Sequence, residues 1–253
     1  MPQQLSVLIL TYNEEENIAA CIDSIGNLAD ELFVLDSFST DKTVEIASSK
    51  GAQVSRRPFD NYGAQRRAAL ELLQYEWVLM LDADERLTPS LQEEIRTVLH
   101  ENPGHDAFSI RRETFFKGGR VRCWSGGSVV RLFRKCKGNY ATDKLVHEKL
   151  LVSGSVGRLR SPILHLTFRS FSQYLPKLQS YSLLSAREAF QKGHRASWIS
   201  FLVYPPARFL KSYLLAGGIL DGIPGVLIAG LSAYSSYLKY ALLWEMQTEQ
   251  KSG

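Results

Sequence analysis

Apolar runs of strand length alternate with amphipathic stretches of helix length through the first hundred residues, and this alternation restricts the fold more than any other feature. Residues 5–10 and 77–81 are apolar at almost every position. Strands of a parallel sheet have this composition because helices cover both faces of the sheet. The strand–helix–strand order therefore predicts a doubly wound, mostly parallel α/β sheet with right-handed crossovers.

The rest of the chain fits one α/β domain followed by a helical region. Asn13 is expected to cap the first helix, because its side chain can accept a bond from a backbone N–H group. The predicted boundary separates a sheet domain at residues 1–168 from a helical extension at residues 169–253. Further strands and helices are expected at residues 31–36, 53–55, 62–75, 77–82, 89–99, 108–110 and 129–133.

The composition is that of a folded protein and argues against a disulfide framework or a zinc module. The 253 residues are 45% hydrophobic and 22% charged, enough for one sizeable core with an appended element. The three cysteines, Cys21, Cys123 and Cys136, form no CxxC pair. No basic stretch followed by an apolar leader opens the chain, so a cytoplasmic location is expected.

Three acidic side chains stand at the ends of predicted strands. Asp36 closes the second strand, and Asp82 and Asp84 follow the fourth. Ligands bind open parallel sheets beyond the carboxyl ends of the strands, where a carboxylate can accept hydrogen bonds from a base or ribose. Two carboxylates one residue apart can also hold Mg²⁺ or Mn²⁺ against a diphosphate. Asp82-Ala83-Asp84 is therefore the sharpest functional signal, although this pattern in a surface loop is usually only solvated.

Three segments of the front half resemble the nucleotide-sugar motifs of family 2 glycosyltransferases, which have the GT-A fold and invert the anomeric carbon. They are Leu10-Thr11-Tyr12-Asn13-Glu14-Glu15, Leu35-Asp36-Ser37-Phe38-Ser39-Thr40-Asp41 and Leu81-Asp82-Ala83-Asp84-Glu85. The chain departs from the family twice: Ser37 takes the place of a usual second aspartate, and Glu85 replaces a frequent aspartate.

The resemblance implies roles for particular residues. Thr11 and Glu14 would border the nucleobase, and Asp36 would hold uracil or ribose. The segment Gln65-Arg66-Arg67 is similar to an Arg-Asn segment of the family, which would place Arg66 near the diphosphate. The implied nucleotide-sugar contacts are thus Thr11, Glu14, Asp36, Arg66 and Asp82, and the implied metal ligands are Asp84 and Asp82.

An inverting transfer needs a general base that takes a proton from the acceptor hydroxyl. The segment Leu145-Val146-His147-Glu148 resembles the Val-His-Glu segment of a bacterial branch that adds sugars to the lipopolysaccharide inner core. By that resemblance Glu148 is the base and His147 contacts the metal or diphosphate. A solvated loop pair is the alternative, with Asp143 as the base. The similarity continues through His165, Lys177, Tyr181, Phe209-Leu210-Lys211, Leu220-Asp221-Gly222 and Lys239-Tyr240.

Two further features are candidates for substrate contact. Trp124 lies in a glycine-rich segment at residues 118–127, where its ring could stack on a sugar or pack in the core. Arg131 and Arg134 bracket an apolar pair and could reach phosphate, although a solvated strand face is the ordinary role for Arg134.

The helical tail carries a basic excess. From residue 160 onward ten lysines and arginines face four acids, whereas the preceding residues hold twenty and twenty-two. Residues 222–238 carry no charge, but Ser232, Ser235 and Lys239 recur on one side, which indicates an amphipathic helix rather than a span. Aromatic side chains mixed with Lys and Arg suit a headgroup interface, so peripheral contact with the cytoplasmic face of the inner membrane is expected. A homodimer seam is the alternative, and no nucleic-acid motif is present.

Together these features predict a metal-dependent enzyme that moves a hexose from a UDP-sugar to a lipopolysaccharide core or similar lipid-linked glycan, with glucose implied by the resemblance. One alternative acceptor is a polyprenyl phosphate, which is already ionised and needs no base. Another alternative is a non-catalytic, membrane-associated protein with the same fold. A nicotinamide dehydrogenase and a P-loop enzyme are disfavoured, because neither GxGxxG nor GxxxxGKS/T follows the first strand.

Overall fold

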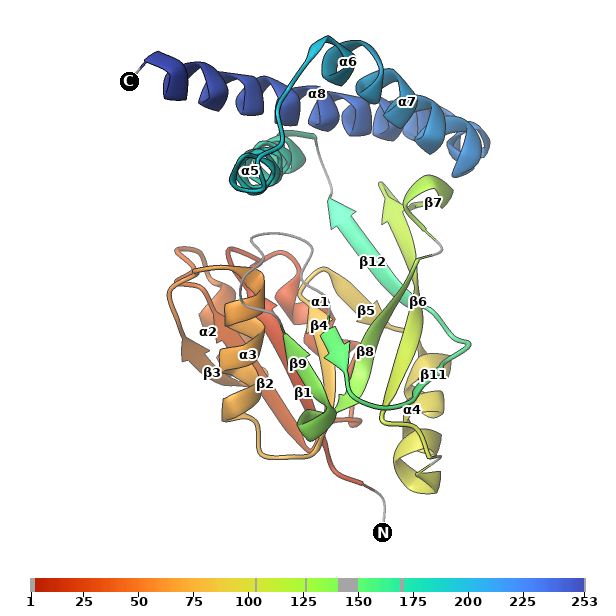
Figure 1. Cartoon of the computed structure of the whole chain (residues 1–253). Coiled ribbons are helices and arrows are strands. Elements are labelled where there is room, and N and C mark those ends of the chain that lie inside the picture. The colour runs from red at the N-terminus through yellow and green to blue at the C-terminus, as the bar shows by residue number, and fades with distance from the viewer. Residues whose placement is uncertain (1–2, 103, 126, 141–149, 169–170, 253) are drawn as a thin grey trace. The chain divides into compact units, whose positions relative to one another are not determined.

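Contacts within the chain divide it into two compact units (Figure 1). The computed structural model describes residues 3–102, 104–125, 127–140, 150–168 and 171–252. The described residues within 1–113, 126–143 and 147–166 form the first unit. Those within 114–125 and 167–253 form the second, so a short internal segment is grouped with the C-terminal helices.

The first unit is built on a mixed sheet whose parallel part comes from the N-terminal half of the chain. Its strand order is β3-β2-β1-β4-β8-β6-β12-β5, with β11 also paired to β6 and with β9 and β10 forming a separate ladder. Strand β7, which pairs with the end of β6, falls within the residues of the second unit. Strands β3, β2, β1 and β4 run parallel, and β8 and β6 continue the sheet antiparallel. The strands are β1 (Leu5–Thr11), β2 (Glu31–Asp36), β3 (Gln53–Arg56), β4 (Trp77–Asp82), β5 (Glu85–Leu87), β6 (Ala107–Phe116), β7 (Gly119–Val121), β8 (Ser128–Arg134), β9 (Gly138–Tyr140), β10 (Leu150–Val152), β11 (Val156–Arg158) and β12 (Ile163–Phe168).

Helices cover both faces of the parallel strands, as the apolar runs predict. Because neighbouring residues of a strand point to opposite faces, Ile9 packs with residues of α1 (Ile18–Asp23), α2 (Thr43–Ser49) and α4 (Pro89–Glu101). Leu8 packs on the other face with residues of α3 (Tyr62–Leu72). The fold class expected from the sequence, a doubly wound α/β sheet, is confirmed, and the antiparallel strands extend it on one side.

Asn13 does not cap the first helix. Its backbone has a φ of 53°, and Asn17 precedes α1 instead. The side chain of Asn13 accepts a 2.9 Å hydrogen bond from the backbone N–H of Thr40, so it joins two loops rather than starting a helix.

The described part of the second unit is mainly helical. Gly193, with a φ of 77°, follows the end of its first helix, and Gly222, with a φ of 62°, precedes the last one. Glycine adopts this left-handed backbone without steric cost. Its elements are η1 (Arg122–Trp124), α5 (Phe171–Gln191), α6 (Trp198–Leu202), α7 (Tyr204–Leu210), the π-helical η3 (Lys211–Leu215), η4 (Gly218–Asp221) and α8 (Ile223–Ser252); a further 3₁₀ turn, η2 (Lys135–Lys137), belongs to the first unit.

Helix α8 is longer than the uncharged run that begins it. Among the described residues it is the one helix long and apolar enough to cross a membrane, over Ile223–Glu249 with a mean hydropathy of 1.2. Only 17% of its most apolar window is buried against other parts of the protein. Length and composition therefore permit a span as well as the surface-lying helix expected from the serine pattern.

Shortening a buried side chain of the central strand β1 should lower the stability of the protein strongly. Ile9 of β1 is fully buried, so Ile9→Ala should lower the free energy of unfolding by about 2–5 kcal/mol, through lost apolar burial and the cavity left behind. Leu72→Ala, at a side chain that is 50% exposed, is the control and should change it by about 0.5 kcal/mol or less. Urea denaturation measures both, and equal effects of the two substitutions would contradict this packing.

Candidate functional site

Three of the predicted site residues end adjacent parallel strands. In the register of the sheet Thr11 of β1 faces Asp36 of β2, and Leu10 of β1 faces Asp82 of β4. The carboxyl ends of these strands thus bring Thr11, Asp36 and Asp82 to one edge of the sheet, which is where open α/β sheets bind ligands.

Asp36 is fully buried and organises the turn that follows β2. One carboxylate oxygen accepts hydrogen bonds from the hydroxyl groups of Thr11, at 3.1 Å, and Ser39. The other accepts from the backbone N–H of Ser39 at 2.9 Å. Between them Phe38 has a φ of 62°, unusual for an aromatic residue. The buried carboxylate therefore holds a tight turn whose phenyl ring is 51% exposed.

The loop after β1 is tied to the same region. The backbone N–H of Glu14 donates to the Thr43 hydroxyl at 2.8 Å, and the Glu14 carboxylate accepts from the Asn17 amide at 2.8 Å. Tyr12, in the same loop, is 59% exposed. The residues predicted to border a nucleobase thus lie in one hydrogen-bonded loop pair.

Asp82 is held by two arginines. Arg131 of β8 donates to one of its carboxylate oxygens, and Arg66 of α3 lies 3.4 Å from the other. Burial alone would raise the pKa of Asp82, but the charges of Arg131 and Arg66 hold that pKa well below its usual range. Asp82 is therefore ionised at neutral pH, with both of its oxygens engaged.

Arg66 is itself surrounded by aromatic rings. Its guanidinium lies 5.9 Å from the ring centre of Tyr62 and 5.6 Å from that of Tyr140. The Tyr140 hydroxyl donates to the Met80 sulfur at 3.2 Å. This setting fixes Arg66 beside the end of β4, because cation–π contacts and the pairing with Asp82 act together.

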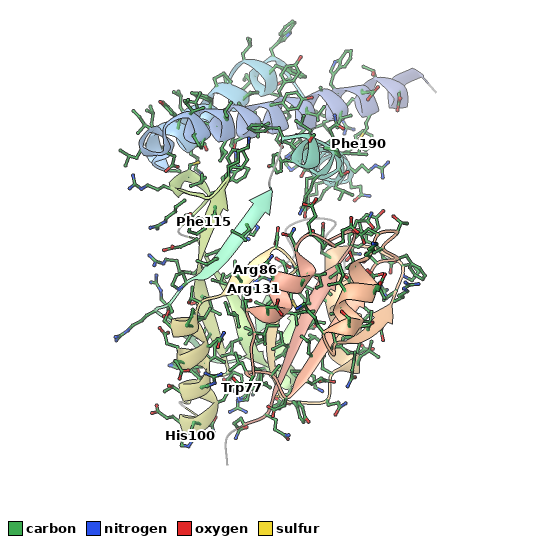
Figure 2. The ribbon with its side chains drawn as sticks, turned by 180° about the vertical axis from the view of Figure 1, so that it is seen from behind. Trp77, Arg86, His100, Phe115, Arg131 and Phe190 are labelled. Carbon is green, nitrogen blue, oxygen red and sulfur yellow. The ribbon has the colours of Figure 1, made fainter. Side chains whose placement is uncertain are left out.

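Glu85 and Arg86 shape the turn that carries Asp84. The Glu85 carboxylate accepts from the backbone N–H of Asp82 at 3.0 Å and from Arg131 at 2.7 Å. Arg86 donates to the carbonyl oxygens of Ala83, Glu85 and Asn17 at 2.7–2.9 Å. Figure 2 labels Arg86 and Arg131, which both reach Glu85. Burial raises the pKa of the Glu85 carboxyl, and the charge of Arg131 opposes that rise. Glu85, Arg131 and the turn therefore form one buried unit.

The sequence gives little indication of the contacts that Arg131 and Arg134 make. The sequence pattern allows Arg131 to reach phosphate, whereas the structure pairs it with Asp82 and Glu85. Its signal is a single charge within an apolar strand, since a buried charge must be paired. Arg134 is not simply solvated: its guanidinium lies 4.7 Å from the ring centre of Trp77.

Asp84 lies beside His165. Its carboxylate is 3.3 Å from His165 Nε2, and only 9% of the Asp84 side chain is exposed. Antiparallel pairing of β5 with β12 sets this contact, because Glu85 faces His165 in the register. Among the described residues no cluster of three or more His, Cys, Asp or Glu side chains forms a metal cage. Asp84 and His165 offer one carboxylate and one imidazole as candidate ligands for a divalent cation.

The remaining predicted residues are Trp124 and a group at residues 143–148. Trp124 belongs to the second unit, is half-buried, and packs against Tyr174 with ring centres 5.5 Å apart. Asp143, His147 and Glu148 lie outside the described residues. The role of each therefore stays a prediction.

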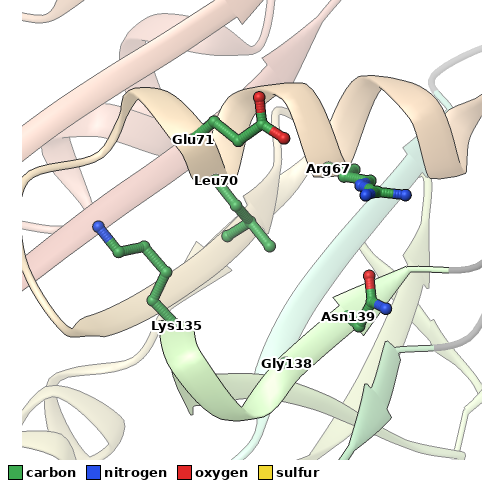
Figure 3. Close-up of a pocket in the computed structure, with 6 residues that line it drawn as sticks. All are labelled: Arg67, Leu70, Glu71, Lys135, Gly138 and Asn139. Carbon is green, nitrogen blue, oxygen red and sulfur yellow. The ribbon is translucent and has the colours of Figure 1, made fainter.

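A separate pocket lies between α3 and β9 (Figure 3). Its volume is about 320 Å³, and Arg67, Glu71 and Lys135 give it a mixed charge. None of the predicted site residues lines it. The acids at the strand ends, rather than this pocket, carry the functional signal.

Comparison with known proteins identifies the family. The profile described as "Glycosyl transferase family 2" matches residues 6–142, which contain the three strand-end motifs. The chain belongs to glycosyltransferase family 2. The predicted family is confirmed, and with it the class of reaction, transfer of a glycosyl group.

Relatives of this glycosyltransferase match it along nearly its whole length. It is 28% identical to an uncharacterized glycosyltransferase of Rickettsia typhi, over 99% of this chain and 90% of that protein. It is 29% identical to the lipopolysaccharide core biosynthesis glycosyltransferase LpsC of Rhizobium meliloti, over 94% and 93%. The crystal structure of TarS 1–349 of S. aureus shares the fold, with a TM-score of 0.51 at 14% identity, over 98% of this chain and 92% of that one.

The buried ion cluster predicts a strong and pH-dependent effect of Arg131. Arg131→Met leaves Asp82 and Glu85 without their shared cation, so it should lower the free energy of unfolding at pH 7 by about 3–5 kcal/mol. The folded pKa of Asp82 is depressed, so its stabilising contribution exists above its unfolded pKa of about 3.9 and is lost as the pH falls. The difference from wild type should therefore narrow towards pH 3 in urea denaturation.

Arg96→Met is the matched control for this prediction. Arg96 pairs with Glu93, whose side chain is 71% exposed, and such surface pairs contribute about 0–1 kcal/mol. An Arg131→Met protein as stable as the Arg96→Met protein would refute the buried cluster.

Proposed function

We propose that this enzyme transfers a hexose, with inversion, from a UDP-sugar to a lipopolysaccharide core or a similar lipid-linked glycan. The observation that carries the proposal is the grouping of Thr11, Asp36 and Asp82 at the carboxyl edge of the parallel strands, with Asp84 two residues beyond β4. The 29% identity to LpsC along nearly the whole chain supports the choice of acceptor.

The nucleoside end of the donor is assigned to the two cross-linked loops after β1 and β2. Exposed aromatic rings at Tyr12 and Phe38 offer faces for a base. Asp36, held by Thr11 and Ser39, fixes these loops, and it reaches the uracil or ribose when one of those donors gives way. Glu14 borders the same site.

The diphosphate end is assigned to the loop after β4. Asp84 would hold Mg²⁺ or Mn²⁺ together with His165, whereas Asp82 anchors Arg66 and Arg131. When bound, the cation would neutralise charge on the departing UDP. Arg66, which is paired with Asp82, would add a positive charge of the protein beside the diphosphate.

Proton removal is assigned to Glu148, with His147 as its neighbour in the site. As the base takes the acceptor proton, the acceptor oxygen attacks the anomeric carbon and the bond to UDP breaks. Trp124 remains a candidate for stacking on the acceptor. Because a lipid-linked acceptor is confined to a membrane, the enzyme would work as a peripheral protein on its cytoplasmic face.

A donor screen tests the proposal directly. Purified enzyme should release UDP from one UDP-hexose, UDP-glucose being the first candidate, when Mn²⁺ or Mg²⁺ and lipopolysaccharide of truncated core are supplied. Calorimetry with UDP and Mn²⁺ gives a second readout that needs no acceptor. Failure to bind UDP with either metal would overturn the proposal and favour the non-catalytic alternative.

Asp84 should be essential for metal use. Asp84→Asn removes a negative charge from the proposed cation site, so transfer should fall by about 100-fold or more, and Mn²⁺ should no longer tighten UDP binding. Asp23→Asn is the control, because Asp23 is 64% exposed and pairs with Lys50 at the surface. If the Asp84 variant kept its metal response, the assignment would fail.

Glu148 distinguishes the two acceptor classes. With a hydroxyl acceptor, Glu148→Gln should lower the turnover by about 100-fold or more while leaving UDP binding intact, because only proton removal is lost. Asp143→Asn tests the alternative base under the same conditions. Full activity of both the Glu148→Gln and the Asp143→Asn proteins with membrane lipid as acceptor would favour a polyprenyl phosphate, whose oxygen carries no proton to remove.

A further inference from the structure

The second unit exposes an unusually apolar surface along one stretch of the chain. Between residues 198 and 227 large side chains of α6, α7, η3, η4 and the start of α8 face solvent, with Trp198 at 83%, Leu215 at 84% and Ile223 at 77% exposure. Monomeric soluble proteins rarely present so many exposed apolar side chains together. We call this stretch the apolar ledge; it also includes Ile199, Leu202, Val203, Leu210, Leu214, Ile219, Leu220, Val226 and Leu227.

The charges around the apolar ledge are mostly positive. From residue 189 to residue 244 the chain carries five lysines and arginines and a single acid, Asp221. The Asp221 carboxylate accepts hydrogen bonds from the backbone N–H groups of Arg122, at 2.7 Å, and Cys123, at 3.2 Å. Arg208 and Lys211 are exposed within the ledge itself. Its one acid is thus occupied by protein donors, and its cations face outward.

We propose that the apolar ledge is the surface by which the enzyme docks on an anionic phospholipid membrane. Apolar side chains enter the boundary between headgroups and acyl chains, while Arg208 and Lys211 meet the lipid phosphates. Trp198 and Tyr204 suit the interfacial depth, because one end of each ring system is polar. The inference rests on the proposed function only for the membrane-borne acceptor.

Helix α8 lies along this surface and does not cross the bilayer. It is packed on α5 by the Ser182–Ser235 contact at 3.0 Å and by a buried cluster that contains Ala186 and Leu243. A spanning α8 would either lose this packing or draw the neighbouring Arg187 and Glu188 of α5 into the hydrocarbon. Charged side chains at that depth are costly, so the packing of α8 on α5 favours a helix that lies at the membrane surface.

Vesicle flotation tests the ledge without donor or acceptor. The full-length protein should float with vesicles of phosphatidylcholine and phosphatidylglycerol in a 3:1 ratio, and much less with phosphatidylcholine alone. Leu215→Glu combined with Ile223→Glu should reduce the bound fraction about tenfold or more, since both side chains already face solvent and the fold is undisturbed. Arg208→Gln with Lys211→Gln should weaken binding by about thirtyfold at low salt.

A matched variant and two further measurements separate membrane docking from dimerisation and from a spanning helix. Leu72→Glu, the same change at an exposed apolar side chain of the first unit, should float like wild type. UDP binding in solution is a separate test of the proposed function. Absence of flotation would overturn the inference, as would a dimer in light scattering that Leu215→Glu disrupts, because the ledge would then be a subunit interface. Retention in membranes after alkaline carbonate extraction would show instead that α8 spans.

Discussion

The guanidinium group of Arg131 is the interaction on which the site depends. Two carboxylates, the partly exposed Asp82 and the fully buried Glu85, meet at the end of β4, and without a cation between them their mutual repulsion and the desolvation of Glu85 would oppose folding. Arg131 comes from β8, which pairs antiparallel with β4. The antiparallel extension of the sheet thus supplies the charge that the parallel half requires.

Arg131 also accounts for the glutamate at position 85, where the family often has aspartate. Its carboxylate reaches both the backbone N–H of Asp82 and the side chain of Arg131. Arg86 then fastens the turn to the start of α1 through the carbonyl of Asn17. Asp84 is therefore presented by a turn whose backbone is fixed before any ligand arrives, which lowers the ordering cost of binding.

Sequence reasoning predicted the fold and the strand-end acids because both follow from local patterns. Apolar runs at residues 5–10 and 77–81 give buried strands, and the residues after them fall at one edge of the sheet by topology. It did not predict which oxygens are occupied, since the pairing of Asp82 with Arg131 joins residues 49 positions apart. The prediction that Asn13 caps the first helix was wrong for a similar reason. Its side chain instead accepts a hydrogen bond from Thr40, which is distant in the chain.

The grouping of residues 114–125 with the C-terminal helices bears on how the chain can be shortened. Phe116 packs near Phe171, Trp124 packs near Tyr174, and Asp221 binds two backbone N–H groups of η1. A chain that ended before α5 would lack these partners of the internal segment at residues 114–125, and Phe116 and Val121 would be exposed to water. The helical tail is thus not a detachable anchor, because its removal would uncover apolar side chains of the internal segment at residues 114–125.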